Sequence, residues 1–395
     1  MKSNYRALSE LIEKVDERND DGAITELIGV SIDKCFIKSV ANTNGTDLSK
    51  YKIIRKNEFA VSLMQVSRDS KIPVARLEDY EVAIMSPAYP IFRVKDTRKI
   101  LPEYLDMWFK RPEFDREAAF IAVGGVRGSM PWEEFVKMKL PVPTIEKQLE
   151  IVNSYKAITE RIALKQKIND NLEATAQTTF KALFIDYDKA DETEFEDFEF
   201  GKYPSSWKLV DLGTVVDVRD GTHDSPSPTP KGKHLVTSRH LLPYGLDRSD
   251  AYFISAEDYA KANERSKVEY GDILFSMIGT IGTISYVTDK DVDFAIKNVG
   301  LFRTSQNPTM RYYILSYLKS RIVTNYISSY MAGSTQSYVS LNVLRTIPLI
   351  LPPADVISHF ENLVTPIFSE LIANTKEISK LNDLKEVITT SLSSR

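Results

Sequence analysis

The sequence Tyr104-Leu-Asp-Met-Trp-Phe-Lys110 returns in related form as Tyr313-Ile-Leu-Ser-Tyr-Leu-Lys319, 209 residues further along the chain. The same offset continues without a gap into Leu140-Pro-Val-Pro143 and Leu349-Ile-Leu-Pro352. A repeat of this length indicates a duplicated domain and not a solenoid, whose units have about 20 to 50 residues. The 395 residues are therefore expected to hold two copies of one domain plan.

A helical hydrophobic period begins after Pro143 and again after Pro352. In the second copy the apolar residues follow alternating steps of three and four, which is typical of a coiled-coil seam. Pro366 is expected to kink this helix or to mark its true start, with Thr365 as a possible N-cap. The expected seam residues are Leu149, Val152, Ile158, Ile162, Leu172, Ile367, Leu371, Ile378, Leu381 and Ile388.

An acidic segment separates the first helix from the second copy. Residues 186–199 hold eight acidic side chains and one lysine, a formal charge of −7, which leaves +3 for the rest of a chain whose total is −4. We interpret it as a solvated linker that would repel DNA. The predicted order is a globular domain at 1–144, a long helix at 145–183, the acidic linker at 184–206, a second globular domain at 207–353 and a second long helix at 354–395. Short β-rich runs mixed with helical stretches predict an α+β class for both domains.

Composition narrows the class of protein. With 43% hydrophobic residues the chain can bury sizeable cores, and its single cysteine excludes an intramolecular disulfide framework. A pI near 5.8 argues against a strongly basic nucleic-acid binder, although it does not exclude a local basic groove. No signal-peptide core or membrane-spanning segment is expected, so we predict a cytoplasmic protein without membrane contact.

Catalytic motifs are mostly missing from the sequence. It has no phosphate-binding loop, no Glu-x-Lys ending of a nuclease motif and no Asn/Asp-Pro-Pro-aromatic tetrapeptide of amino-methyltransferases. His-Glu-x-x-His and a nucleophile elbow are absent too, and four histidines with one cysteine make a zinc site improbable. We therefore predict no catalytic residues and no metal site in this chain.

Several segments could contact DNA. The loop from Asp220 to His234 is rich in Ser, Thr, Pro and Lys; it reads either as an exposed loop or as a donor-rich loop for phosphates and base edges. Gly279-Thr-Ile-Gly282 is more typical of a strand turn than of a phosphate cradle. Arg127 and Gln336 occupy equivalent repeat positions, and both residue types can make bidentate contacts with bases. The candidate DNA-binding residues are Gln65, Arg68, Lys71, Arg127, Thr222, His223, Ser225, Lys231, Lys233, Arg239, Thr335 and Gln336.

Six segments taken in order resemble the specificity subunit of type I restriction-modification systems. They are Trp207-Lys-Leu-Val-Asp-Leu-Gly213, Asp220-Gly-Thr-His-Asp-Ser-Pro226, Tyr270-Gly-Asp-Ile-Leu274, Gly279-Thr-Ile-Gly282, Gly333-Ser-Thr-Gln336 and Ile347-Pro-Leu-Ile-Leu-Pro-Pro353. The first copy departs from the pattern: it lacks the Asp-Gly-Thr-His run and has Asn57-Glu58 in place of Gly271-Asp272. The second helix lacks the glutamine that family members often carry near its start, which the first copy retains as Gln148. These departures suggest two recognition domains of different lineage.

The resemblance implies a non-catalytic protein that reads a split DNA target. Each globular part would be a target-recognition domain for one half of the target, and the two long helices would pair antiparallel as a spacer. The implied partners are double-stranded DNA, two modification (adenine methyltransferase) subunits and restriction (translocase-endonuclease) subunits. These subunits would use S-adenosylmethionine, ATP and Mg, and this chain would bind no cofactor itself. The alternatives are a coiled-coil adaptor that binds no nucleic acid and the specificity part of a fused restriction-methylation enzyme.

Overall fold

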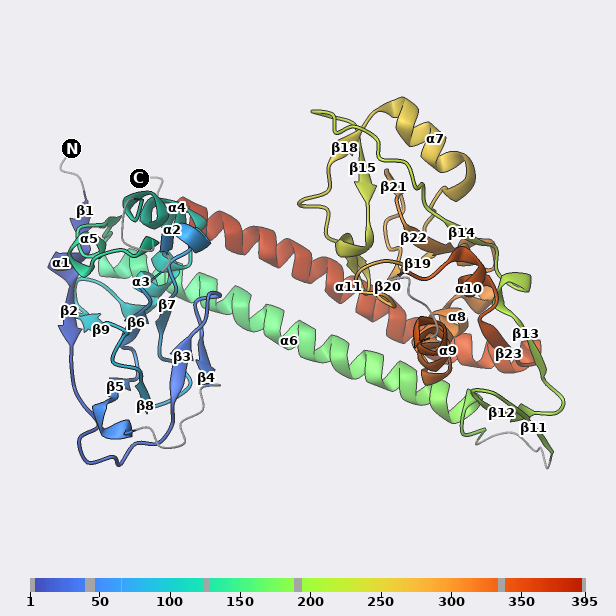
Figure 1. Ribbon diagram of the computed structural model, residues 1–395, viewed down its shortest axis with the longest axis horizontal. Helices are drawn as coiled ribbons and strands as arrows, with labels where there is room; N and C mark the ends of the chain where they lie inside the picture. Colours follow the sequence, from blue (N-terminus) through green and yellow to red (C-terminus); the bar gives the residue numbers. More distant parts are fainter. Residues whose placement is uncertain are drawn as a thin grey trace. The chain divides into compact units, whose positions relative to one another are not determined.

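The computed structural model describes residues 4–39, 47–64, 66–123, 128–187, 194–332 and 338–392. Contacts divide the chain into two units, of which the first comprises residues 1–162 with 380–395 and the second comprises residues 163–379. Each unit is described by itself below, with the labels of Figure 1.

The first unit is built on a four-stranded antiparallel sheet. Its strand order is β2-β9-β6-β7, with β2 at Ile12–Val15, β9 at Ile91–Val94, β6 at Phe59–Val61 and β7 at Val74–Arg76. Two-stranded pairs surround it: β1 (Tyr5–Ala7) with β10 (Lys139–Pro141), β3 (Ile28–Val30) with β4 (Phe36–Lys38), and β5 (Lys52–Arg55) with β8 (Val82–Met85). The helices are α1 (Leu8–Leu11), α2 (Val66–Asp69), α3 (Pro102–Phe109), α4 (Pro112–Ile121) and α5 (Trp132–Phe135), with a 3-10 turn at Leu48–Lys50.

The second unit repeats this plan. Its four-stranded sheet has the order β14-β22-β19-β20, with β14 at Val218–Asp220, β22 at Val299–Phe302, β19 at Ile273–Ser276 and β20 at Ile284–Tyr286. The strand pair β13 (Lys208–Asp211) and β23 (Pro348–Leu351) corresponds to β1 and β10. Helices α8 (Arg311–Leu318), α9 (Arg321–Ala332) and α10 (Leu341–Arg345) follow the sheet as α3, α4 and α5 do in the first unit. The duplication predicted from the 209-residue offset is therefore present in the topology.

The second unit also contains elements that give it a distinct outer face. Strands β18 (Phe253–Ile254), β15 (Lys233–Val236) and β21 (Phe294–Ile296) form a second sheet, beside helix α7 (Ala256–Ser266). A small pair joins β16 (Leu241–Leu242) to β17 (Gly245–Leu246). The 3-10 turns lie at Leu212–Thr214, Ser238–His240, Thr304–Gln306 and Pro308–Met310.

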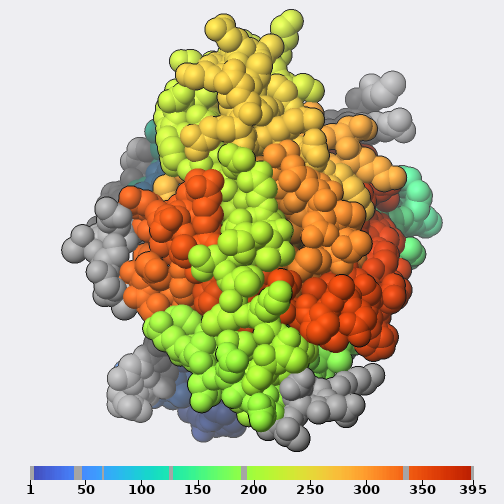
Figure 2. Space-filling model, turned by 90° about the vertical axis from the view of Figure 1, so that its right-hand side faces the viewer, coloured from blue at the N-terminus to red at the C-terminus, as the bar shows by residue number. Residues whose placement is uncertain are grey.

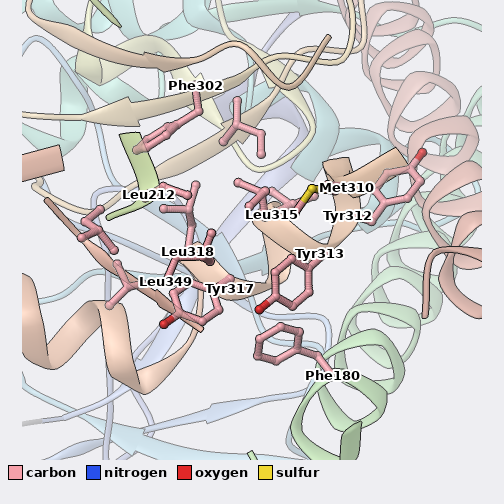
Figure 3. Close-up of a cluster of buried hydrophobic side chains, with 14 of the residues drawn as sticks. Phe180, Leu212, Phe302, Met310, Tyr312, Tyr313, Leu315, Tyr317, Leu318 and Leu349 are labelled. Atoms are coloured by element: carbon pink, nitrogen blue, oxygen red, sulfur yellow. The ribbon is translucent and has the colours of Figure 1, made fainter. Parts of the chain in front are cut away.

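Both cores contain clusters of aromatic residues, some of them from the repeated helices α3 and α8. Phe59 and Phe92 stack with ring centroids 5.2 Å apart in the first unit. In the second unit, the rings of Tyr313 and Tyr317 are buried beside Phe180 (Figure 3). Burial of such large apolar side chains is the main driving force for folding.

Two long helices follow the globular parts, α6 (Ile145–Phe184) and α11 (Ala354–Ser391). Within the second unit they run antiparallel, since Lys165 contacts Asn374 while Phe180 and Phe184 contact Phe360. Within the first unit, the start of α6 packs in one cluster with the end of α11, including Ile388 and Leu392. The predicted α+β fold, with two globular parts each followed by a long helix and the helices paired antiparallel, is confirmed.

The expected seam residues differ in burial. Leu371, Ile158 and Ile162 are buried, and most of the others are half-buried: Val152, Leu172, Ile367, Ile378, Leu381 and Ile388. Leu149 does not lie in the buried stripe, because its side chain is 44% exposed. The predicted period places Ile367 on the buried stripe. In the structure Phe368 is fully buried there instead, because the stripe advances by four residues after Val364 and not by three.

Pro366 does not start the second helix. Helix α11 already begins at Ala354 and contains Pro366 in its interior. Thr365 does not act as an N-cap, because its hydroxyl donates to the Glu361 carbonyl one turn earlier, at 2.6 Å. Proline lacks the N–H that would reach back four residues, and neighbouring packing can compensate for that loss.

The acidic segment is not wholly a solvated linker. Strands β11 (Phe195–Phe198) and β12 (Gly201–Pro204) form an antiparallel hairpin within it. Tyr187 and Tyr203 are buried in the core of the second unit, and Trp207 joins them. In Figure 2 the yellow-green atoms of this region lie on one face beside orange and red atoms of the C-terminal half. Aromatic residues lie among the acidic ones, and their burial holds this segment against the second unit.

No helix in the described part of the chain combines the length and the apolar character that crossing a membrane requires.

Candidate nucleic-acid interface

The predicted Asp-Gly-Thr-His segment, residues 220–223, leaves β14 and lies against the connection from β21 to β22. The Thr222 N–H donates to the Ile296 carbonyl at 2.9 Å, and the Asn298 N–H donates to the Thr222 carbonyl at 3.2 Å. Gly221 permits this approach, because a Cβ at that position would lie 2.3 Å from the Ile296 carbonyl oxygen. The motif is therefore a backbone-to-backbone junction.

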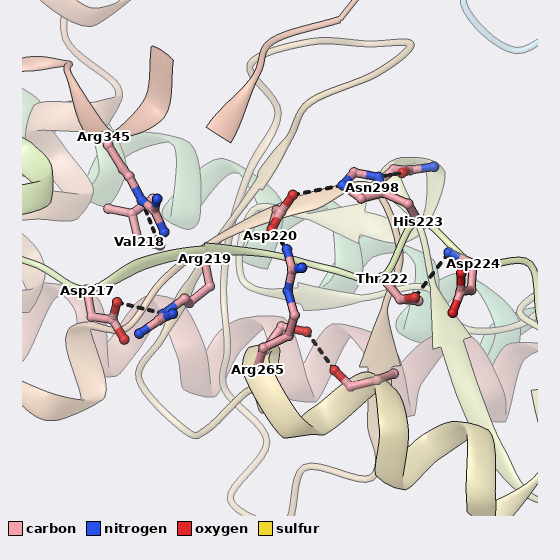
Figure 4. A network of polar contacts seen from close by, with 12 residues as sticks. Asp217, Val218, Arg219, Asp220, Thr222, His223, Asp224, Arg265, Asn298 and Arg345 are labelled. Atoms are coloured by element: carbon pink, nitrogen blue, oxygen red, sulfur yellow. Dashed lines mark hydrogen bonds and ion pairs between the residues drawn. The ribbon is translucent and has the colours of Figure 1, made fainter. Parts of the chain in front are cut away.

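Asp220 anchors the segment from below. Its side chain is 6% exposed and forms an ion pair with Arg265 of α7 (Figure 4). The same carboxylate accepts a hydrogen bond from Nε2 of His223 at 2.9 Å. A buried carboxylate needs such partners, because an unpaired buried charge is costly.

His223 stands above this anchor, with 66% of its side chain exposed. Its Nδ1 lies 2.8 Å from Oδ1 of Asn298 (Figure 4). Asn298 is not among the residues predicted from the sequence. The available signal was weak: asparagine tolerates a positive φ, and Asn298 has a φ of 53° between two buried strands.

Charged and hydroxyl groups surround His223. The Ser225 hydroxyl accepts a hydrogen bond from the ammonium group of Lys297, which forms no ion pair with any described residue. Lys261 of α7 donates to Asp224 at 3.0 Å and holds the pKa of that carboxyl below its ordinary value. Lys297 is therefore the cation of this group that is left for an external anion.

Arg239 lies on a turn that a buried histidine fixes. Nδ1 of His240 accepts a hydrogen bond from the Thr237 N–H at 2.8 Å, and burial lowers the pKa of His240. A neutral ring suits this acceptor role. Arg239 itself pairs with exposed Asp250 at 3.4 Å, a contact that water screens and a stronger anion could replace.

Three shallow hollows open around these residues. Their volumes are about 350, 360 and 290 Å³, and they are lined in turn by His223, by Thr222 with Ser225, and by Arg239. Four predicted residues thus lie on neighbouring hollows. Lys231 and Lys233 line none of the three: both are exposed, and Lys233 lies 3.9 Å from Asp293.

Two exposed apolar side chains border the same hollows. Ile278 is 42% exposed and Tyr338 is 44% exposed, and their backbones form an isolated β-bridge. Gly279 and Thr280 follow in the turn between β19 and β20 and line the 290 Å³ hollow. The surface thus combines an apolar ridge with hydrogen-bonding groups, which is the mixture that base edges and thymine methyl groups require.

The first-unit candidates lie on α2 and the turn after it. Arg68 pairs with Asp69 at 2.8 Å. Gly128 lies close to this turn, because a Cβ added to that glycine would be 3.3 Å from the backbone nitrogen of Arg68. Lys71 is exposed. Gln65, Arg127, Thr335 and Gln336 lie outside the described residues.

Within the described residues, no group of three or more His, Cys, Asp or Glu side chains is placed to bind a metal ion.

Comparison with known proteins places this surface in a family context. Residues 204–388 match the family described as type I restriction modification DNA specificity domain. The chain is 24% identical over 306 residues to the type I restriction enzyme MjaIX specificity subunit of Methanocaldococcus jannaschii, covering 73% of this chain and 67% of that one. It is 23% identical over 223 residues to the MjaVIII specificity subunit of the same organism, covering 55% and 52%. The matches thus span between about half and two thirds of these relatives.

A solved structure shares the fold of the whole chain. It is the crystal structure of a type I restriction-modification system S subunit from M. genitalium, with a TM-score of 0.57 and 14% identity. The likeness covers 99% of this chain and 96% of that one. At this identity it supports the architecture alone.

Proposed function

We propose that this chain, as a member of the specificity-subunit family of type I restriction-modification systems, reads a bipartite DNA target. One recognition domain reads each half of the target. The observation that carries the proposal is the surface around residues 220–223 and 298, which lies inside the matched specificity domain. It offers hydrogen-bonding side chains, a lysine with no ion pair among the described residues and two exposed apolar side chains on one face of the second unit.

The two long helices serve in this proposal as a spacer. A helix of 40 residues is about 60 Å long, and one turn of DNA is about 34 to 36 Å. Joining two readers at a fixed distance makes the second contact effectively intramolecular, so two weak readers can give one specific complex.

The chain is proposed to contribute no catalytic residue. Methylation of adenine and cleavage would come from modification and restriction subunits that use S-adenosylmethionine, ATP and Mg. Exposed apolar side chains on the long helices support docking of the modification subunits. Leu164 on α6 is 59% exposed, and Leu384 and Val387 on α11 are 48% and 62% exposed. Isolated exposed leucines are common, but Leu384 and Val387 are three residues apart and therefore neighbours on the surface of one helix.

The test is methylation of a random duplex library by the chain assembled with its modification subunits. We expect methylated products to share two short sequences separated by a fixed gap. Methylation without sequence preference would refute the proposal, and so would sequence preference that persists when the chain is omitted. A fused enzyme would instead methylate DNA without added subunits, and a coiled-coil adaptor would leave sequence choice to its partners.

A further inference from the structure

Asn298 occupies a central place on the candidate interface. Together with Ile278, it lines both the 350 Å³ and the 290 Å³ hollows. Its positive φ is held by the hydrogen bond from its N–H to the Thr222 carbonyl. Residues other than glycine adopt this backbone conformation seldom, and such residues concentrate at functional sites.

The amide of Asn298 has one side committed and one side open. Oδ1 faces Nδ1 of His223 at 2.8 Å, whereas Nδ2 has no hydrogen-bond partner within the described part of the chain. Nε2 of His223 is in turn bound to buried Asp220 at 2.9 Å. The chain Asp220–His223–Asn298 thus runs from the domain interior to the surface.

The contact with His223 fixes which end of the amide faces outward. A carboxylate only accepts, so Nε2 of His223 donates to Asp220. Oδ1 of Asn298 faces Nδ1 of the same ring, and its NH₂ group points outward. If the amide turned, Oδ1 would point outward instead.

On the premise of the proposed DNA reading, we propose that Asn298 reads the edge of one base and that Asp220 and His223 are positioning residues that orient its amide. An outward NH₂ group matches acceptors such as guanine O6 and N7 or thymine O4. An outward Oδ1 matches the amino groups of cytosine and adenine. The identity of that base pair would therefore depend on a histidine that need not touch it.

Charged groups surround His223. Asp220 and Arg265 lie beneath it, Asp224 and Lys261 lie beside it, and Lys297 lies near Ser225. Each of the two carboxylates is matched by a cation. Asp220, paired with Arg265, thus provides a fixed acceptor for Nε2 of His223.

The experiment sequences methylated products from the random duplex library, using the complex with modification subunits. Asn298→Asp removes the outward donor and should change the preference at one base pair of one half-site by on the order of tenfold or more. His223→Lys still donates to Oδ1 and should keep the wild-type preference. His223→Ala leaves the amide free to turn and should broaden the preference at that same base pair.

The two His223 variants separate orientation from simple support. If His223 only supports the loop, His223→Lys and His223→Ala should have the same effect; if it orients the amide, only His223→Ala should broaden the preference. The matched control is Asn325→Asp, an exposed asparagine on α9 that should leave both half-sites unchanged.

The outcomes distinguish this inference from the proposed function. If the wild type selects no sequence, the proposed DNA reading is wrong. If it selects a bipartite sequence that Asn298→Asp does not alter, only the role of Asn298 is overturned. Loss of a whole half-site by Asn298→Asp would also overturn it, since that result indicates structural support of the domain.

Discussion

At the scale of single residues, the two copies preserve geometry where their sequences differ. Asn57 and Gly271 both have a positive φ, at 67° and 88°. The carboxylate that follows each is buried and accepts a backbone N–H from three residues earlier, at 2.8 Å in Glu58 and 2.7 Å in Asp272. Burial raises the pKa of both groups. The exchange of Gly-Asp for Asn-Glu therefore leaves the turn intact.

The missing glutamine of the second copy is replaced in a similar way. Gln148 accepts a hydrogen bond from the Leu101 N–H at 2.9 Å, just before α3. In the second copy Glu361 accepts from the N–H groups of Tyr312 and Tyr313, at 2.9 and 2.8 Å, at the start of α8. Glu361 lies one helical turn beyond the position equivalent to Gln148. The free N–H groups at the start of α8 are therefore bound by a residue at a different position of the long helix.

Glu361→Gln should remove a pH-dependent term from the stability of the second unit. Burial raises the pKa of Glu361 from its ordinary 4.5 to about 7. Between these values the folded state binds more protons than the unfolded state, so stability falls as pH rises through the window. The full loss is on the order of 3 kcal/mol above the window. Glutamine can accept both N–H groups through Oε1 and carries no charge.

Denaturant unfolding below and above this window checks the prediction. The variant should match the wild type on the acidic side and exceed it on the alkaline side. Glu264→Gln, at an exposed position of α7, is the control and should follow the wild type throughout. Equal differences at both pH values would show that the ionised form of Glu361 carries no cost.

At the scale of elements, a polar network lies inside the helix pair of the second unit. Asn374 is 1% exposed, and its amide joins Lys165 at 2.6 Å and Asn169 at 3.0 Å. Lys165 also pairs with Glu377 at 3.1 Å. Asn374 follows Leu371 by three residues and so falls on the buried stripe. The hydrophobic period does not predict its partners, because those depend on the register between the helices. Polar groups in a seam fix that register at a cost in stability.

Asn374→Leu should therefore raise stability and weaken register. Lys165 keeps Glu377, and Asn169 is half-exposed and can bind water, so little is left unsatisfied. We expect a gain of about 1 kcal/mol in thermal or denaturant unfolding. We also expect mixed oligomers by light scattering, since the helices can then pair in other registers. A lower melting temperature with a single species would show that the network is a net source of stability.

Leu384→Glu combined with Val387→Glu should weaken binding of the modification subunits. Both side chains are largely exposed, so the folded chain should tolerate the charges, whereas an apolar interface should not. Co-purification with the modification subunits should fall while the melting temperature stays unchanged. Ser379→Glu introduces one such charge at an exposed position of the same helix and should bind normally. Undiminished co-purification of the double variant would place the docking surface elsewhere.

At the scale of the whole molecule, the architecture could be predicted from the sequence, whereas the details of the interface could not. A 209-residue offset and two helical periods predicted the repeated plan, because burial patterns survive divergence. Asn298 was not predicted, since its contact with His223 joins residues 75 positions apart through a parallel bridge that no local pattern encodes. The folded part of the acidic segment was missed for the same reason, because the burial of Tyr187 and Tyr203 depends on the domain beneath them.

The spacer proposal leads to a prediction about DNA geometry. Four residues inserted into both helices, after Ile162 in α6 and after Ser379 in α11, add about one turn, or about 6 Å, to each. The insertion keeps the buried stripe nearly in phase, because four residues exceed one turn of 3.6 only slightly. If the helices set the distance between the readers, the gap between the half-sites should lengthen by about one to two base pairs at about 3.4 Å each, with both half-site sequences unchanged. Insertion into α6 alone is the control and should impair assembly, because the two helices would lose register. An unchanged gap in the double insertion, with methylation retained, would show that the distance is set by the partners instead of by the paired helices.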